Sequence, residues 1–184
     1  MLSVTFASTN RNKFLEVQSI LSTFDIDVQF AQVSLVEVQS DSLEDIATQK
    51  AKSAIEQSQR PVMVEDDGLF IDSLNGFPGP YSSFAFRTIG NEGILKLLFG
   101  TGQRSASFRS LIAYHDGKNT SISEGIMKGR ISETITEGGW GYDPIFIPSG
   151  TELTFAQLKD KKNEYSHRRR ALEKFAHWIL SSRD

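Results

Sequence analysis

The chain of 184 residues contains no cysteine. Disulfide bonds, thiolate nucleophiles and metal sites built from cysteine are therefore excluded. Long apolar runs are also missing, because no stretch approaches the roughly 20 residues that a membrane-spanning helix requires. The formal net charge is only −3, so the overall charge gives no reason to expect binding to nucleic acid or to an anionic membrane, although it is compatible with a local basic pocket.

The N-terminal segment, MLSVTFASTN, lacks the charged and then apolar pattern of a secretory signal. We therefore expect a cytoplasmic protein. The composition is that of a globular protein, with 39% hydrophobic and 23% charged residues, and the length fits one domain with a substantial core. Neither an internal repeat nor a low-complexity linker divides the chain.

Hydrophobic periodicity predicts alternating strands and helices in the first half of the chain. Apolar residues at every second position predict a strand over residues 2–8, and helical spacing predicts a helix that begins near Asn10, a good capping residue. A second helix is expected from Ser42, with Asp45 in a capping-box position. The other predicted elements are strands over residues 27–31 and 60–69, a turn over 75–80 and a short helix over 92–99.

The second half is predicted to open with a hairpin. Residues 105–115 and 120–128 have the pattern of long strands, joined by a turn at Asp116 and Gly117. A glycine-rich loop follows, and a final helix is expected from about Ser166. This order predicts an α/β protein with a mixed β-sheet shared by two lobes and flanked by helices, so that residues 1–184 form a single two-lobed domain.

The segment ASTNRNK, residues 7–13, lies where a predicted strand ends and a helix begins. Backbone N–H groups at a helix start attract anions, and Ser8, Thr9, Asn10 and Lys13 would add polar side chains to such a site. The alternative is an ordinary capped helix with a solvated lysine. The phosphate-binding loop GxxxxGK is absent.

The segment VEDDGLF places three acids, Glu65, Asp66 and Asp67, directly after an apolar run. On a strand, Glu65 and Asp67 point to one face and Asp66 points to the other. A divalent cation would relieve the repulsion among them, and carboxylate oxygens are the ligands that Mg²⁺ prefers. Glu37 also follows an apolar run and is a further candidate ligand. The alternative is a polar turn that closes the strand at Asp67 and Gly68.

Two segments near the C-terminus also carry chemically useful side chains. One is GGWGYDP, residues 138–144, in which Trp140 and Tyr142 offer flat faces for stacking on a base and Asp143 offers an acceptor. The alternative is that the two aromatic rings fill an edge of the core. In KKNEYSHRRRA, residues 161–171, the successive basic residues cannot all face one side, because each helical residue turns by roughly 100°. They form either a donor cluster or an exposed basic helix start.

Together and in this order, these motifs resemble those of the inosine triphosphate pyrophosphatase family. STNRNK is similar to the family's T-x-N-x-x-K motif, VEDDGL to its acid motif (E/D)-D-S-G-L, and GFPGPYS to the segment that follows. GWGYDPIF is similar to G-F-G-(Y/W)-D-P-x-F, and Lys162 with Ser166-His167-Arg168 to K-x-x-x-S-H-R. Two positions depart from the family: Asp67 stands where Ser or Thr is usual, and Trp140 replaces the commoner Phe.

The resemblance implies an elongated α/β fold with a central cleft, a homodimer, and a reaction that depends on Mg²⁺, with Mn²⁺ as an alternative metal. It implies that the partner is a small-molecule nucleoside triphosphate, namely ITP, dITP or XTP, which is cleaved to the monophosphate and pyrophosphate. The implied metal ligands are Glu37, Asp66 and Glu65, and the implied catalytic residues are Asp66, Glu65 and Lys13. The implied substrate-binding residues are Ser8, Thr9, Asn10, Lys13, Lys50, Trp140, Gly141, Tyr142, Asp143, Lys162, Ser166, His167 and Arg168.

Other functions are open at this point. A Maf-type nucleotide pyrophosphatase is thought to share the architecture but prefers other nucleotides, and the Ser-His-Arg terminus argues against it. A non-catalytic nucleotide-binding protein would keep the cleft without turnover, and the presence of Lys13, Asp66 and Lys162 argues against that function. An RNA-binding module is the weakest candidate, because the net charge is negative and the basic residues are scattered.

Overall fold

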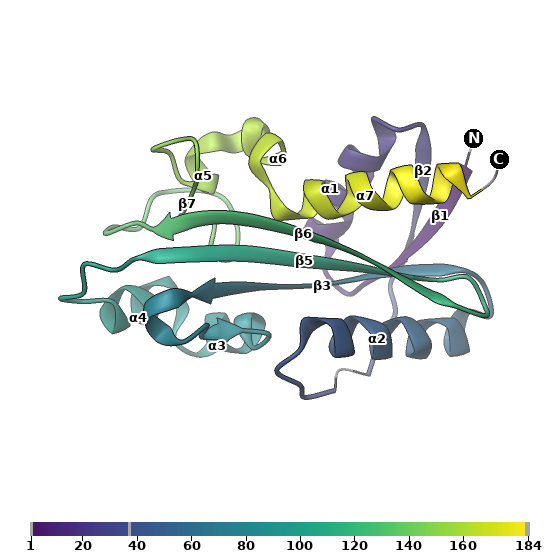
Figure 1. The fold of residues 1–184 in the computed structure, drawn as a ribbon, viewed down its shortest axis with the longest axis horizontal. Coiled ribbons are helices and arrows are strands. Elements are labelled where there is room, and N and C mark those ends of the chain that lie inside the picture. The colour runs from purple at the N-terminus through teal and green to yellow at the C-terminus, as the bar shows by residue number, and fades with distance from the viewer. Residues whose placement is uncertain (1, 37, 183–184) are drawn as a thin grey trace. The chain divides into compact units, whose positions relative to one another are not determined.

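The computed structural model describes residues 2–36 and 38–182 of the chain (Figure 1). The chain divides into two compact units. Unit 1 comprises Met1–Asp66, Ser110–Gly125 and Arg168–Asp184, and unit 2 comprises Asp67–Arg109 and Ile126–His167. Each unit is therefore assembled from separate stretches of sequence, and the boundary cuts the acid motif between Asp66 and Asp67.

The strands are β1 (Leu2–Ala7), β2 (Ile26–Ala31), β3 (Val62–Ile71), β4 (Pro78–Gly79), β5 (Ser105–His115), β6 (Thr120–Ile131) and β7 (Phe146–Pro148). The helices are α1 (Arg11–Ser22), α2 (Leu43–Ser58), α3 (Ser82–Thr88), α4 (Gly90–Leu97), α5 (Phe155–Leu158), α6 (Lys162–Tyr165) and α7 (His167–Ser181), with 3-10 turns η1 (Asp72–Leu74) and η2 (Lys159–Lys161). Over the described residues, the seven strands form one sheet in the order β2-β1-β3-β5-β6-β7, with β4 paired to β3. Strand β1 is parallel to β2 and β3, whereas β4 and β7 are antiparallel to their partners, so the predicted mixed sheet is confirmed.

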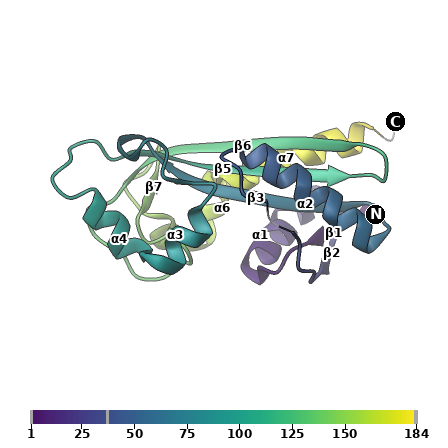
Figure 2. The same ribbon diagram turned by 90° about the horizontal axis from the view of Figure 1, so that it is seen from below.

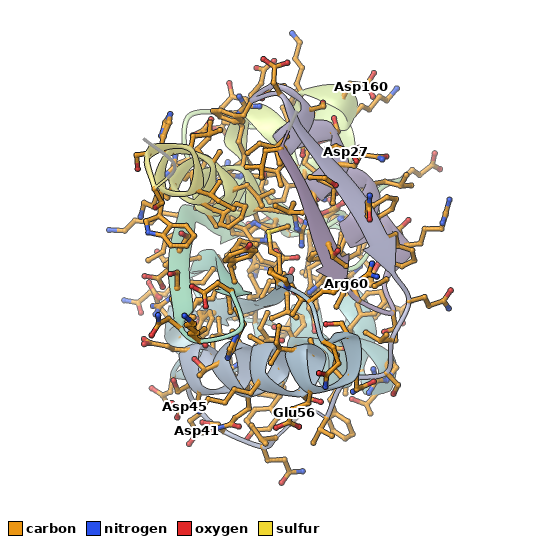
Figure 3. All side chains as sticks on the ribbon, turned by 90° about the vertical axis from the view of Figure 1, so that its right-hand side faces the viewer. Asp27, Asp41, Asp45, Glu56, Arg60 and Asp160 are labelled. Carbon is orange, nitrogen blue, oxygen red and sulfur yellow. The ribbon has the colours of Figure 1, made fainter. Side chains whose placement is uncertain are left out.

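Helices cover both faces of the strands in unit 1. Apolar side chains of α1 and α7 pack with β1 in one core, which includes Phe6, Val17 and Phe175. Helix α2 lies on the opposite side of the strands from α7 (Figure 3), and its Asp45 and Glu56 are exposed. The charged outer face and buried inner face of α2 follow from the helical spacing of its apolar residues.

Two helix starts and the hairpin agree closely with the prediction. Asn10 caps α1 by accepting a hydrogen bond from the backbone N–H of Lys13, and Ser42 caps α2 in the same way. Strand β5 has the predicted bounds, and β6 extends three residues further than predicted, to Ile131. At the turn, the backbone N–H groups of Asn119 and Lys118 donate to Asp116 at 2.7 Å, which lowers the pKa of that carboxyl.

Unit 2 has its own apolar core, which includes Leu69, Ile94, Phe108, Phe146 and Phe155. Helices α3 and α4 lie side by side in this unit (Figure 2). The sequence did not predict α3, β7, α5 or α6, and the segment predicted as a turn over residues 75–80 contains the short strand β4. The predicted helix over 92–99 is α4, which begins and ends two residues earlier.

Strand β3 continues through the acid motif, so the alternative that Asp67 and Gly68 form a closing turn is wrong. The strand runs from Val62 to Ile71 rather than over residues 60–69. Gly68 is required by close packing: a Cβ atom there would lie 2.4 Å from the carbonyl oxygen of Gly79 on β4. A glycine that permits close approach of a neighbouring strand has the same sequence signature as one that forms a turn.

Over the same described residues, no helix combines the length and the apolar character needed to cross a membrane.

Candidate active site

Glu65 lies at the centre of a buried polar network in unit 1. Its side chain is fully buried, and its carboxylate accepts hydrogen bonds from Arg168 Nε at 2.8 and 3.0 Å and from Ser110 Oγ at 2.6 Å. The ammonium of Lys13 lies 3.8 Å away. Arg168 also donates to Glu16 on α1. Burial of this carboxylate is tolerable because two cations and a hydroxyl surround it.

Asp66 has a different partner, as expected for the next residue along a strand. Its Oδ1 accepts a hydrogen bond from Lys50 Nζ at 2.5 Å, and Lys50 comes from the buried face of α2. Both side chains keep about a tenth of their surface exposed, whereas Glu65 keeps none. The predicted alternation of the acids across the strand is therefore reflected in two separate carboxylate–ammonium contacts.

The start of α1 has the polar organisation expected for a helix N-terminus. Ser8 Oγ accepts a hydrogen bond from the backbone N–H of Asn10 at 3.0 Å, and Asn10 Oδ1 accepts one from the N–H of Lys13 at 3.2 Å. Thr9 is exposed. Unit 1 thus brings Lys13 to the acid motif, while the predicted phosphate-binding role of Ser8, Thr9 and Asn10 stays a prediction.

In unit 2, the glycine-rich loop is folded around Asp143. The Asp143 carboxylate accepts hydrogen bonds from the backbone N–H of Trp140 at 3.1 Å and from Lys162 Nζ at 2.8 Å. The Lys162 ammonium also lies 4.8 Å from the centre of a Trp140 ring, a cation–π distance. Gly139 must be glycine, because its φ is +69° and a Cβ atom would lie 2.6 Å from that of Asp143. Trp140, Asp143 and Lys162 are therefore brought together, while their predicted roles toward the base and the phosphates stay predictions.

Tyr142 is a core residue of unit 2 rather than an exposed flat face. It is 5% exposed, its hydroxyl donates to the backbone oxygen of Ser82 at 2.9 Å, and Phe86 packs edge-on against its ring. Burial raises the pKa of the Tyr142 hydroxyl above its ordinary value of 10.0. These contacts of Tyr142 fix the loop between Gly139 and Asp143 to α3. The contribution of Tyr142 to base binding stays a prediction.

The buried hydroxyl makes the stability of the fold sensitive to alkaline pH. Above about pH 10 the unfolded chain releases the Tyr142 proton while the folded protein keeps it. The contribution of the protonated Tyr142 hydroxyl to the free energy of unfolding is therefore fully present below about pH 10 and is lost as the pH rises further. Tyr142→Phe should reduce the free energy of unfolding by about 1 kcal/mol near neutral pH, because the Ser82 carbonyl loses its donor. Urea unfolding should show a smaller further loss above about pH 10 in the variant than in the wild type; an identical alkaline loss would contradict the assignment.

The basic segment before and within α7 separates into buried and exposed residues. His167 stacks on Phe108, with ring centres 4.6 Å apart and an interplanar angle of 10°, and its Nε2 lies 3.7 Å from Asp67 Oδ2. Arg169 instead pairs with Glu173 one turn along the helix. Ser166, directly before α7, is fully buried. The prediction that these basic residues cannot share one face is confirmed.

Several residues of these networks were not identified from the sequence. Glu16 lies one helical turn after Lys13 and so shares a helix face with it. Because Lys13 was itself a candidate residue, this spacing could have identified Glu16 as a neighbour of the site. Ser110 is a polar residue within the apolar strand β5, and such a residue is expected to have a partner. Asn91, which donates to the carbonyl of Gly141 at 3.1 Å, gave no signal, because it lies in the first turn of a short helix 50 positions away from that glycine.

The metal prediction depends partly on Glu37, which lies outside the described residues. Among residues 2–36 and 38–182, no three Asp, Glu or His side chains gather closely enough to hold a metal ion. Asp66 fits a hard cation, since it offers carboxylate oxygens on a side chain that is not fully buried. Glu65 fits less well, because both of its oxygens already accept hydrogen bonds from Arg168.

Comparison with known proteins bears on these motifs. The sequence model of the Ham1 family matches residues 4–178. A dITP/XTP pyrophosphatase of Methanopyrus kandleri is 48% identical to this chain, and the match covers 98% of each of the two chains. A dITP/XTP pyrophosphatase of Saccharolobus solfataricus is 46% identical, and that match covers 95% of this chain and 92% of the relative. The solved structure of a HAM1 protein from Coxiella burnetii superposes with a TM-score of 0.86 at 30% identity, covering 98% of this chain and 100% of that one. The Staphylococcus aureus Ham1 protein gives 0.83 at 29% identity, with 98% and 99% coverage.

These matches extend over nearly the whole chain and include all of the motifs on which the resemblance to the inosine triphosphate pyrophosphatase family rests. The predicted resemblance is confirmed, and the chain belongs to the Ham1 family.

Proposed function

We propose that the protein is a nucleoside triphosphate pyrophosphatase that hydrolyses the non-standard purine nucleotides ITP, dITP and XTP and so removes them from the nucleotide pool. Relatives named dITP/XTP pyrophosphatase support this reaction, since they match nearly the whole chain at 42–48% identity. The observation that carries the mechanism is the pair of carboxylate–ammonium contacts on adjacent residues of β3, Glu65 with Lys13 and Asp66 with Lys50.

The reaction begins with attack of water on the α-phosphorus. A bond forms between the water oxygen and phosphorus, the bond from phosphorus to the bridging oxygen breaks, and pyrophosphate leaves. Asp66 accepts the proton that the water loses, because its side chain keeps about a tenth of its surface exposed whereas the neighbouring Glu65 keeps none. Lys13 and Lys50 offset the charge of the phosphates, and the family resemblance assigns a similar role to Lys162.

The proposed cofactor is Mg²⁺, with Mn²⁺ as an alternative, held by Asp66 together with the predicted ligands Glu37 and Glu65. When bound, the ion neutralises phosphate charge and makes a bound water easier to ionise. Glu65 would have to give up hydrogen bonds to Arg168 or Ser110 in order to bind the ion. Asp66 can exchange Lys50 for it more readily, since each of these side chains is about a tenth exposed.

Selection among purines follows from the atoms at position 6 of the base. Hypoxanthine and xanthine carry an oxygen there, whereas adenine carries an amino group. The family resemblance assigns the reading of this edge to Asp143, His167 and Arg168, with stacking by Trp140. A donor placed against the oxygen would face another donor in adenine, and each unpaired buried group costs about 1–3 kcal/mol, or roughly five- to 150-fold in rate.

We therefore expect kcat/KM for ITP, dITP and XTP to exceed that for ATP by at least about tenfold. A pyrophosphate-release assay over a nucleotide panel, run with Mg²⁺ and again with EDTA, measures this ratio and the metal requirement together. Equal rates on ATP and ITP would refute the proposed preference. Undiminished turnover in EDTA would refute the metal requirement alone, and release of orthophosphate instead of pyrophosphate would refute the site of attack.

We further propose a cytoplasmic homodimer, as the family resemblance implies. Three aromatic side chains near α3, Phe77, Tyr81 and Phe84, are 40%, 40% and 61% exposed, and a second copy of the chain would cover such a surface. A cytoplasmic location would give the enzyme direct access to the nucleotides that it removes.

A further inference from the structure

Asp67 is the one acid of the VEDDGLF motif that the proposed mechanism does not use. It lies on β3 in unit 2, and its Oδ2 is 3.7 Å from Nε2 of His167. By strand alternation, Asp67 shares a face of β3 with Glu65 and points away from the face of Asp66. The contacts follow this pattern, because Glu65 pairs with Arg168 and Asp67 with the preceding residue, His167. Asp67 therefore contacts the first residue of the basic motif at the start of α7.

The ring of His167 packs against two aromatic neighbours. Phe108 is nearly parallel to it at 4.6 Å, and Phe155 lies 6.3 Å away at 30°. These contacts set the plane of the imidazole, but a half-turn about the Cβ–Cγ bond returns the ring to the same plane and would leave them almost unchanged. Such a half-turn exchanges nitrogen and carbon positions along the ring edge. The stacking alone therefore does not determine which ring atom faces which neighbour.

The carboxylate of Asp67 adds a constraint of this kind. At 3.7 Å the contact is longer than a hydrogen bond, so the Asp67 oxygen acts on Nε2 through its charge. That charge favours the ring orientation that presents a nitrogen, and it favours the tautomer that carries the proton on that nitrogen. Both side chains are largely withdrawn from water, with 4% of His167 and 17% of Asp67 exposed, so solvent screens this interaction weakly. A serine, usual at this position in the family, is shorter and carries no charge.

We propose that Asp67 is a specificity-determining positioning residue, which fixes the orientation and tautomer of His167 for the discrimination of 6-oxopurines from adenine. The inference rests on the proposed function, in which His167 reads the base edge. Along that edge, 6-oxopurines present an N1–H donor and an oxygen acceptor, whereas adenine presents an N1 acceptor and an amino donor. A ring held in one tautomer matches one pattern only, whereas a ring free to exchange tautomers can match either.

The test compares Asp67→Asn with a control, Asp72→Asn. The amide introduced by Asp67→Asn has nearly the same shape as the carboxylate but can either donate or accept, so it no longer selects one tautomer. Asp72 lies five residues further along, is exposed, and takes no part in the proposed mechanism, so its variant removes the same charge without touching His167. Two quantities are measured: the imidazole ¹⁵N chemical shifts of His167, and the ratio of kcat/KM for ITP to that for ATP.

We expect Asp67→Asn to shift the ¹⁵N signals of His167 and to lower the ITP-to-ATP ratio by at least about tenfold. Asp72→Asn should leave both unchanged. Unchanged ¹⁵N signals in Asp67→Asn, or shifted signals with an unchanged ratio, would overturn the inference. A higher requirement for Mg²⁺ without a change in the ratio would also overturn it, because it would place Asp67 among the metal ligands.

Failure of the proposed function gives a different result. If the wild-type protein shows no preference for ITP over ATP, the proposed function fails and this inference falls with it. If the wild-type preference is present and Asp67→Asn retains it, only the role of Asp67 is refuted. In case Asp67→Asn does not fold, Asp67→Ser provides the second variant. Serine carries no charge, so it should also shift the ¹⁵N signals of His167 and lower the ITP-to-ATP ratio, and unchanged values would overturn the inference.

Discussion

Asp66→Asn is expected to reduce kcat for ITP by about 10²–10⁴-fold, because an amide cannot accept the proton that the attacking water loses. The fold should persist, since the amide oxygen can still accept the hydrogen bond from Lys50 that Asp66 accepts in the wild type. The remaining ammonium would lack a full counter-charge, at a cost of about 1–3 kcal/mol. Steady-state kinetics and urea unfolding of the same preparation measure the two effects separately.

Glu65→Gln is the matched comparison, because it removes the neighbouring charge from the same strand. Glu65 is fully buried and is bonded to Arg168 and Ser110, so its neutralisation should reduce stability more and kcat less than the change at Asp66. If Glu65→Gln lowers kcat as far as Asp66→Asn while stability is retained, Glu65 is the base. Wild-type turnover in Asp66→Asn would exclude Asp66 from the chemical step.

Arg168→Met is expected to reduce the free energy of unfolding by about 3–5 kcal/mol, the largest stability effect of any single substitution considered. The guanidinium is 1% exposed and pairs with both Glu65 and Glu16. Its removal leaves Glu65 in the core without its principal partner. Because a domain of ordinary size is stable by only about 5–15 kcal/mol, the variant should unfold at a much lower urea concentration.

The adjacent Arg169→Met is the matched control, since it removes the same charge from the next residue of α7. Arg169 pairs with Glu173 at the surface, and such pairs contribute only about 0.2–1 kcal/mol. Adding Glu65→Gln to Arg168→Met should recover part of the loss, because the buried negative charge is then removed as well. Equal destabilisation by the two arginine variants would show that the buried network does not hold the fold together.

Local patterns predicted the elements that are long and regularly spaced. The helix that starts after Asn10, the helix that starts after Ser42, and the strand Ser105–His115 all appear where periodicity and capping chemistry placed them. The short elements α5, α6 and β7 span three or four residues each, which is too few to show a repeat. Helix α3 was missed because its aromatic residues at positions 84 and 86 alternate as in a strand.

The site was predicted as a set of residue types rather than as a set of pairs. Glu65 and Arg168 are 103 positions apart, so nothing in local spacing could indicate that each is the partner of the other. Tyr142 was expected to present a face to a base, yet its burial is decided by Phe86 and Ser82 on a helix that the sequence did not reveal. Motif recognition selected the candidate residues, and the tertiary contacts show which of them pair.

The division of the chain into units has a consequence for how this enzyme can change over evolution. Unit 2 is encoded by two separate segments, 67–109 and 126–167, and unit 1 by three, so neither corresponds to one continuous stretch of gene. Strands β3, β5 and β6 each pass from one unit into the other within a single element. A single recombination event could not exchange either half as a cassette, which leaves point substitution as the simplest route to a new substrate range.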